Sequence, residues 1–233
     1  MNKAKLGKFC AVALTATILS GGLLPSVSKA ENATNQVVPE ELTVDMAAFE
    51  QLVIEVKEGK ITNDTEAEAR LAELEAMNLP PKMTTMGSSG SSYLIKAAEV
   101  AACIAAVGPF DTATAKNNAD TASAAALDSG YSGAHNGKAD AFRHSFWNAL
   151  MSESIGTGQA KEVADIHEEY NEGPQIEHDM DYFNNSKGRS AFTALENSGS
   201  STSEANLKKR IKSDIDAGKM KYIKSGKLVY TNK

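Results

Sequence analysis

Cysteine is scarce in this chain of 233 residues, which contains only Cys10 and Cys103. Cys10 lies in an N-terminal segment that we expect to be removed, so the remaining chain cannot form an internal disulfide. The protein must therefore be held together by packing alone or with the help of a metal. Cys103 lies in an apolar, alanine-rich run, which favours a buried position for its small side chain.

The chain also lacks an apolar run long enough to cross a bilayer, which requires about 20 residues. Its N-terminal apolar run, residues 9–24, follows three lysines and precedes Ser28-Lys29-Ala30, where small residues occupy the positions that signal peptidase reads. We therefore expect residues 1–30 to be a cleaved signal peptide and the protein to be secreted. An uncleaved membrane anchor is the alternative.

A net positive charge is missing as well, because the formal net charge is −6. Residues 1–30 hold four lysines and no acidic residue, so their removal changes the formal net charge to −10. An acidic protein gains no general attraction to nucleic acids or anionic lipids. We expect no nucleic-acid partner and no transmembrane segment after cleavage, and the composition identifies no other partner.

Several well-known catalytic motifs are absent. There is no C-x-x-C, P-loop or G-x-S-x-G sequence, and the second histidine of an H-E-x-x-H motif after His167 is replaced by Asn171. Asp179 and Asp181 resemble the start of an EF-hand loop, but Ser190 stands where that loop requires glutamate. These absences exclude the common zinc-protease, nucleotide-binding and EF-hand classes.

Apolar residues recur every three or four positions over most of the chain, which predicts a mainly α-helical protein. We expect an N-terminal helical hairpin region at 31–79, a Pro/Gly/Ser linker at 80–92, and a helical bundle domain at 93–233 that ends in a small β-hairpin. The expected helices are 45–57, 65–77, 93–107, 111–128, 139–153, 157–170, 174–196 and 204–217, with two strands within 219–230. An isolated hairpin is marginally stable, so it must pack on the helices.

Chemically useful side chains concentrate in residues 139–189, which contain three of the four histidines. Helical spacing places Asp140 and His144 one turn apart on one face, and the same spacing separates Asp181 from Asn185 on a later helix. If the three helices of this stretch bundle, one polar cluster forms between them. The predicted metal ligands are Asp140, His144, His167, Asp181 and Asn185.

Imidazole, carboxylate and amide oxygen together fit a divalent cation such as zinc, manganese, magnesium or calcium. Such a cation activates water for hydrolysis, with His144, His167 and Glu168 as the predicted catalytic groups. Arg143 and Arg189 stand beside motif residues and are predicted to bind an anionic substrate group such as phosphate.

This stretch resembles an uncharacterised bacterial domain family that occurs in secreted proteins and at the C-termini of polymorphic-toxin-like proteins. The resemblance covers about residues 130–230 and departs from the family pattern at Tyr182-Phe183, where we would expect a residue such as histidine. No activity is established for the family, so the resemblance implies where the site lies rather than what it does. The similar segments are Asp140-Ala-Phe-Arg-His144, Trp147-Asn-Ala-Leu-Met151, Asp165 with His167-Glu168, Met180-Asp181, Asn184-Asn185 and Gly188-Arg189.

Three hypotheses follow from the sequence. The first is a metal-dependent hydrolase, acting on phosphoesters or lipids as a toxin-like effector. The second is a non-enzymatic secreted binding or interaction module, in which the polar cluster is a structural network that sets the helix register. The third is a membrane-active segment within residues 93–127.

Overall fold

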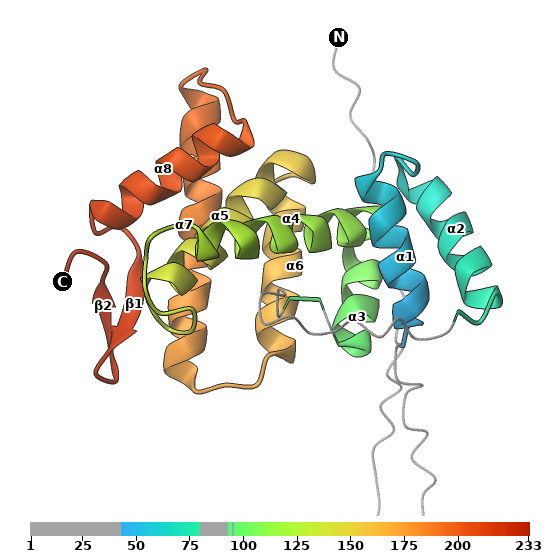
Figure 1. Cartoon of the computed structure of the whole chain (residues 1–233), viewed down its shortest axis with the longest axis horizontal. Coiled ribbons are helices and arrows are strands. Elements are labelled where there is room, and N and C mark those ends of the chain that lie inside the picture. The colour runs from blue at the N-terminus through green and yellow to red at the C-terminus, as the bar shows by residue number, and fades with distance from the viewer. Residues whose placement is uncertain (1–42, 80–92, 95) are drawn as a thin grey trace, which may run out of the picture. The chain divides into compact units, whose positions relative to one another are not determined.

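Helix α5 (Lys138–Ser154) lies at the centre of this computed structural model, which describes residues 43–79, 93, 94 and 96–233. It is buried along most of its length because four other helices pack around it (Figure 1). These are α4 (Pro109–Leu127), α6 (Thr157–Tyr170), α7 (Gln175–Asn197) and α8 (Glu204–Asp216). The other described elements are α1 (Met46–Lys57), α2 (Asp64–Ala76), α3 (Ala97–Val107), β1 (Lys221–Lys224) and β2 (Lys227–Tyr230).

The predicted fold class is confirmed, because the described residues are mainly helical and end in a two-stranded antiparallel hairpin. All these elements belong to one compact unit, residues 40–233. The predicted signal peptide at 1–30 and the linker at 80–92 lie outside the described residues. Among the helices described, none combines the length and the apolar character needed to cross a membrane.

The crossing of α5 and α7 brings the two backbones close together. A Cβ atom added at Gly188 of α7 would lie 2.0 Å from the backbone oxygen of Ser145 on α5, so only glycine fits there. Phe142 and Phe146 of α5 point into the hydrophobic core, with ring centroids 5.3 Å apart. The glycine therefore sets the distance between the two helices that carry most of the motif.

The helices α1 and α2 pack against α4 at the other end of the unit (Figure 1). The carboxylate of Asp45 accepts hydrogen bonds from the first backbone amides of α1, and Asn63 caps α2 in the same way. Asp64 reaches across to accept a hydrogen bond from the backbone amide of Phe110 at 3.1 Å. The helical pair predicted for residues 31–79 thus contributes to the same hydrophobic core as the alanine-rich helix α4.

The hairpin packs on α7, as the sequence required. Ser225 and Gly226 both have positive φ angles, which suits a tight two-residue connection between antiparallel strands. Asn184 of α7 donates to the backbone oxygen of Lys221 at 2.9 Å and accepts from its backbone amide at 3.0 Å. These two bonds anchor β1 to the helix that carries Asp181.

One helix boundary differs from the prediction in a way that matters for the site. Helix α3 begins at Ala97 rather than at residue 93, and Leu94 adopts a positive φ of 54°. The backbone amide of Leu94 donates to Glu99 at 3.2 Å, so the chain turns sharply before the helix. The turn directs Tyr93 into the interior, where it is fully buried.

Candidate metal centre

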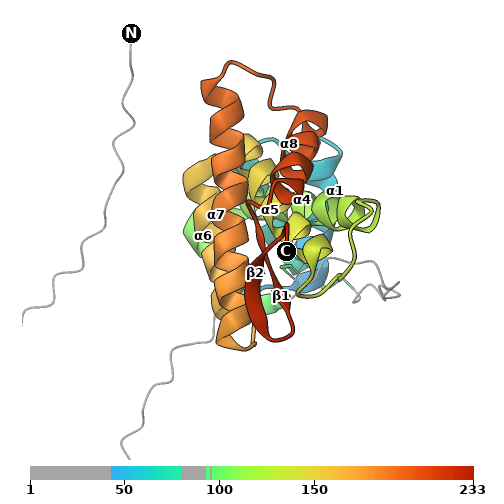
Figure 2. The same cartoon turned by 90° about the vertical axis from the view of Figure 1, so that its left-hand side faces the viewer.

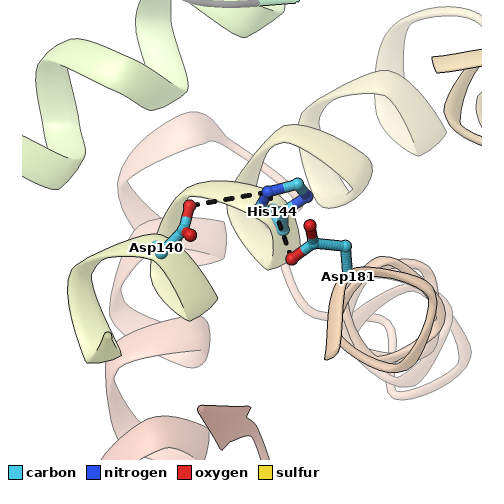
Figure 3. Close-up of side chains that lie close together, drawn as sticks. All are labelled: Asp140, His144 and Asp181. Atoms are coloured by element: carbon cyan, nitrogen blue, oxygen red, sulfur yellow. Dashed lines mark ion pairs between the residues drawn. The ribbon is translucent and has the colours of Figure 1, made fainter. Parts of the chain in front are cut away.

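Three side chains with metal-ligating groups converge where α5 crosses α7 (Figure 3). Asp140 and His144 come from α5, and Asp181 comes from α7. The Nε2 atom of His144 lies 3.5 Å from an oxygen of Asp140 and 3.3 Å from an oxygen of Asp181. One ligand atom from each residue lies within 4.8 Å of the others, and all three residues are buried. The structure therefore brings together three of the five predicted metal ligands.

Asp140 is held in place by two short hydrogen bonds. Its Oδ1 atom accepts from Arg143 at 2.6 Å, and its Oδ2 atom accepts from the backbone amide of Asn136 at 2.6 Å. Hydrogen bonds of this length to a carboxylate are among the strongest in proteins. The carboxylate of Asp140 thus has a fixed orientation toward His144.

Asp181 is less well satisfied. Its Oδ1 atom is buried without a hydrogen-bond donor. Burial, and then the neighbouring carboxylates of Glu168 and Asp140, together raise the pKa of its carboxyl group to about 9. In the protein without a cation, Asp181 is therefore protonated at neutral pH.

His144 is held in its neutral form. Its complete burial lowers the pKa of the imidazole, and the nearby guanidinium of Arg143 lowers it further. Its Nδ1 atom is also buried without a hydrogen bond. Neutral imidazole is the form that binds metals, so its protonation state suits that role.

The donor set fits a divalent cation. Two carboxylates and one neutral imidazole face one another, and two of their buried polar atoms have no hydrogen-bond partner. A buried polar atom without a partner costs free energy, and a cation bound by the Nε2 atom of His144 and the two carboxylates would supply the interaction that the Oδ1 atom of Asp181 lacks. It would also offset the repulsion between the carboxylates that raises the pKa of Asp181.

Glu168 and Asn185 form a second layer beside this group. The Nδ2 atom of Asn185 donates to Glu168 at 3.2 Å, and the Oδ1 atom of Asn185 accepts from Asn148 at 2.8 Å. Glu168 lies 3.8 Å from the Nδ1 atom of His144, and burial raises the pKa of its carboxyl group. The side-chain oxygen of Asn185 is thus occupied by Asn148, and its amide orients Glu168.

His167 lies beside the group rather than in it. Its Nδ1 atom is 2.7 Å from the carboxylate of Glu99 on α3, and its ring centroid is 6.5 Å from that of His144. Tyr93 packs against both rings, with centroids 4.4 Å from His167 and 5.3 Å from His144, and it stacks on Trp147 at 4.1 Å. Glu99 and Tyr93 were not predicted from the sequence, where the only signal for them is an acidic residue inside an apolar, alanine-rich helix.

The other two histidines differ in exposure. The side chain of His178 is 17% exposed, and its Nδ1 atom lies 3.3 Å from Glu168, so it borders the polar cluster. The side chain of His135 is 75% exposed and lies 3.5 Å from Glu177. His178 is thus a partly exposed histidine in contact with the buried Glu168.

The two predicted substrate-binding arginines occupy different environments. Arg143 is bound to Asp140, and its guanidinium lies 4.9 Å from the ring centroid of Tyr93, inside the cluster. Arg189 donates to Asn148 at 2.6 Å and lines a shallow pocket of about 430 Å³ together with serine and threonine side chains. The chain Arg189–Asn148–Asn185 connects this pocket to Glu168 by hydrogen bonds.

A family model described as "Domain of unknown function (DUF6973)" matches residues 102–219. The match covers half of the chain and includes all of α4, α5, α6, α7 and α8, so it contains Asp140, His144 and Asp181. The expectation of an uncharacterised domain family is thereby confirmed. No curated protein and no solved structure matches the chain.

Proposed function

Because the chain belongs to this family of unknown function, we propose from its geometry that it is a metal-dependent hydrolase that holds a divalent cation with Asp140, His144 and Asp181. The observation that carries the proposal is the buried convergence of these donors within 4.8 Å of one another. A mixture of imidazole and carboxylate favours zinc or manganese over calcium, which prefers oxygen ligands alone.

Glu168 is the proposed general base. A cation at the site would lower the pKa of a bound water and polarise the bond to be hydrolysed. Glu168 is buried beside His144, and its raised pKa brings it closer to neutral pH, where a general base is most effective. The amide of Asn185 holds its carboxylate beside the Nδ1 atom of His144.

The remaining predicted residues have supporting roles in this proposal. Glu99 fixes the ring orientation of His167, which then serves as a second proton donor or acceptor beside Tyr93. Arg143 and Arg189 provide positive charge for an anionic group such as a phosphoester. We also propose that residues 1–30 direct export and that the secreted protein acts as a toxin-like effector.

A non-enzymatic binding module is the second candidate. It is favoured by the continuous hydrogen-bond chain through Arg189, Asn148, Asn185 and Glu168, which would by itself fix the register of α5, α6 and α7. In that case the polar cluster is structural, and substitutions within it reduce stability without affecting any reaction.

Hydrolysis assays separate the two candidates. Residues 31–233, loaded with zinc or manganese, would be assayed with a chromogenic phosphodiester and a chromogenic carboxylic ester. We expect metal-dependent turnover of one of them, and Glu168→Gln should lower kcat at least 100-fold while metal binding persists. Metal-loaded protein that turns over neither substrate class, with Glu168→Gln affecting stability alone, would support the binding module.

A further inference from the structure

The end of the unit formed by α7 and the hairpin carries lysines without carboxylate partners. Residues 204–233 contain nine lysines and arginines but only three acidic residues, although the whole chain has a net charge of −6. Lys219 and Arg210 pair with Asp214, which leaves much of this charge uncompensated. Within the described residues, no carboxylate lies within 4.0 Å of Lys138, Lys187, Lys221, Lys224 or Lys227.

Aromatic rings lie between these lysines. The ammonium group of Lys221 lies 4.2 Å from the ring centroid of Phe183 and 5.4 Å from that of Tyr230. Lys187 lies 5.1 Å from Phe183 on the same helix. Tyr230 is 47% exposed, which is unusual for a large aromatic side chain. We call this set the lysine–aromatic surface: Lys138, Lys187, Lys221, Lys224, Lys227, Phe183, Tyr222 and Tyr230.

The tip of the hairpin places two like charges opposite each other. Lys224 and Lys227 are register partners across the turn, and both side chains are exposed. Like charges directly opposite in an antiparallel pair are destabilising. The arrangement is unfavourable for the hairpin itself, and an anionic surface at the tip would relieve the repulsion.

We propose that the lysine–aromatic surface binds anionic phospholipid headgroups. Lysines attract the negative surface of such a membrane, and tyrosine is enriched at the membrane–water interface because its ring is apolar and its hydroxyl is polar. Figure 2 shows the hairpin beside α7 at this end, on the side that faces the viewer, with its tip pointing along the helix. Such an exposed surface suits a flat lipid layer, whereas proteins hold single-stranded nucleic acids in grooves.

Docking there would bring the candidate metal centre close to the lipid surface. Asn184 binds the backbone of Lys221, and Asp181 lies one turn earlier on the same helix. The backbone amide of Ile223 donates at 2.8 Å to the oxygen of Asn136, the residue whose amide binds Asp140. The hairpin is therefore tied to both helices of the site, although lipid binding itself does not depend on a metal.

The test is co-sedimentation of residues 31–233, which contain the whole compact unit, with vesicles in EDTA at about 0.1 M salt. We expect partitioning onto vesicles of phosphatidylglycerol and phosphatidylcholine, and little onto phosphatidylcholine alone. The double variant Lys224→Gln/Lys227→Gln should weaken binding about 25-fold, because each lysine contributes roughly a factor of five. Both lysines are exposed, so the fold should be unaffected.

The matched control is Lys57→Gln/Lys60→Gln, which removes the same charge from exposed positions at the α1 end. It should leave vesicle binding within about two-fold of wild type. Equal partitioning onto neutral vesicles, no partitioning at all, or an equal loss in the control would overturn the proposal. Tighter binding to a labelled single-stranded oligonucleotide than to the anionic vesicles would also overturn it.

Discussion

The α1–α4 contact and the α5–α7 crossing are both buried contacts between helices, but opposite kinds of side chain fill them. The buried residues of α1 and α4 are mainly apolar, with alanine the most frequent, and Asn117 of α4 donates at 3.0 Å to the backbone oxygen of Val53 on α1. The nearby ion pair of Glu55 with Arg70 joins α1 to α2. At the α5–α7 crossing, Asp140, His144 and Asp181 are buried together.

The difference supports the proposed metal site over a purely structural polar network. Burying carboxylates costs several kcal/mol unless partners compensate for the lost water. The α1–α4 contact forms with mainly apolar side chains, so a buried helix contact in this chain does not require carboxylates. In the proposed metal site, a cation would compensate for the burial of these carboxylates.

The largest expected effect comes from breaking the close approach at the crossing. The substitution Gly188→Ala puts a methyl group 2.0 Å from the backbone oxygen of Ser145, so the helices must separate. We expect a loss of about 3 kcal/mol in the free energy of unfolding, measured by chemical denaturation. In the control, Gly158→Ala, the added methyl group meets nothing within 4 Å, and the variant should be at least as stable as wild type. Equal stability of the two variants would mean that the crossing is not tight.

A smaller effect is expected from Asp181→Asn, which should raise the free energy of unfolding rather than lower it. Because the folded-state pKa of Asp181 is raised from 3.8 to about 9, the metal-free protein should lose stability as pH rises from about 4 to 9. The variant removes this loss and should be more stable than wild type by about 2 kcal/mol at pH 7 in EDTA. Thermal unfolding across this pH range measures it, with the exposed Asp179→Asn as control. If Asp181→Asn were less stable than wild type at pH 7 in EDTA, this prediction would be contradicted.

The smallest effect is expected at Glu55, in the α1–α2 region, where stability depends on pH in the opposite direction. Arg70 lowers the pKa of Glu55 from 4.5 to about 2, chiefly through hydrogen bonds. The pair therefore stabilises the fold above about pH 4.5, and that contribution disappears as pH falls toward 2. Because Arg70 is partly exposed, Glu55→Gln should cost only about 1 kcal/mol at pH 7. The free energy of unfolding would be measured between pH 7 and pH 2 for Glu55→Gln and for the exposed control Glu68→Gln. Equal losses of stability in the two variants would contradict the prediction.

Local patterns were sufficient to predict most of the fold. The helical periodicity around α5, α6 and α7 is strong, and Gly218 and the Ser225-Gly226 pair mark the end of α8 and the hairpin turn. The predicted start of α3 was wrong, because the turn at Leu94 depends on a hydrogen bond from its backbone amide to the carboxylate of Glu99 rather than on a breaker residue.

The site could be predicted only where its residues share a helix or a repeated spacing. Asp140 and His144 are one turn apart, so their proximity follows from the sequence. The pairing of His167 with Glu99 joins residues far apart in the chain, and the burial of Tyr93 depends on how α3 packs against α6. Such long-range contacts leave no periodic signal in one sequence.

Metal binding by the α5–α7 crossing tests the account most directly. Metal-stripped protein of residues 31–233 would be titrated with zinc and with manganese by calorimetry, beside His144→Ala and the exposed control His135→Ala. The account predicts one tight site per chain in wild type and in the control, and at least a 100-fold weaker affinity in His144→Ala. Wild-type protein that binds neither metal, or an affinity unchanged by His144→Ala, would contradict it.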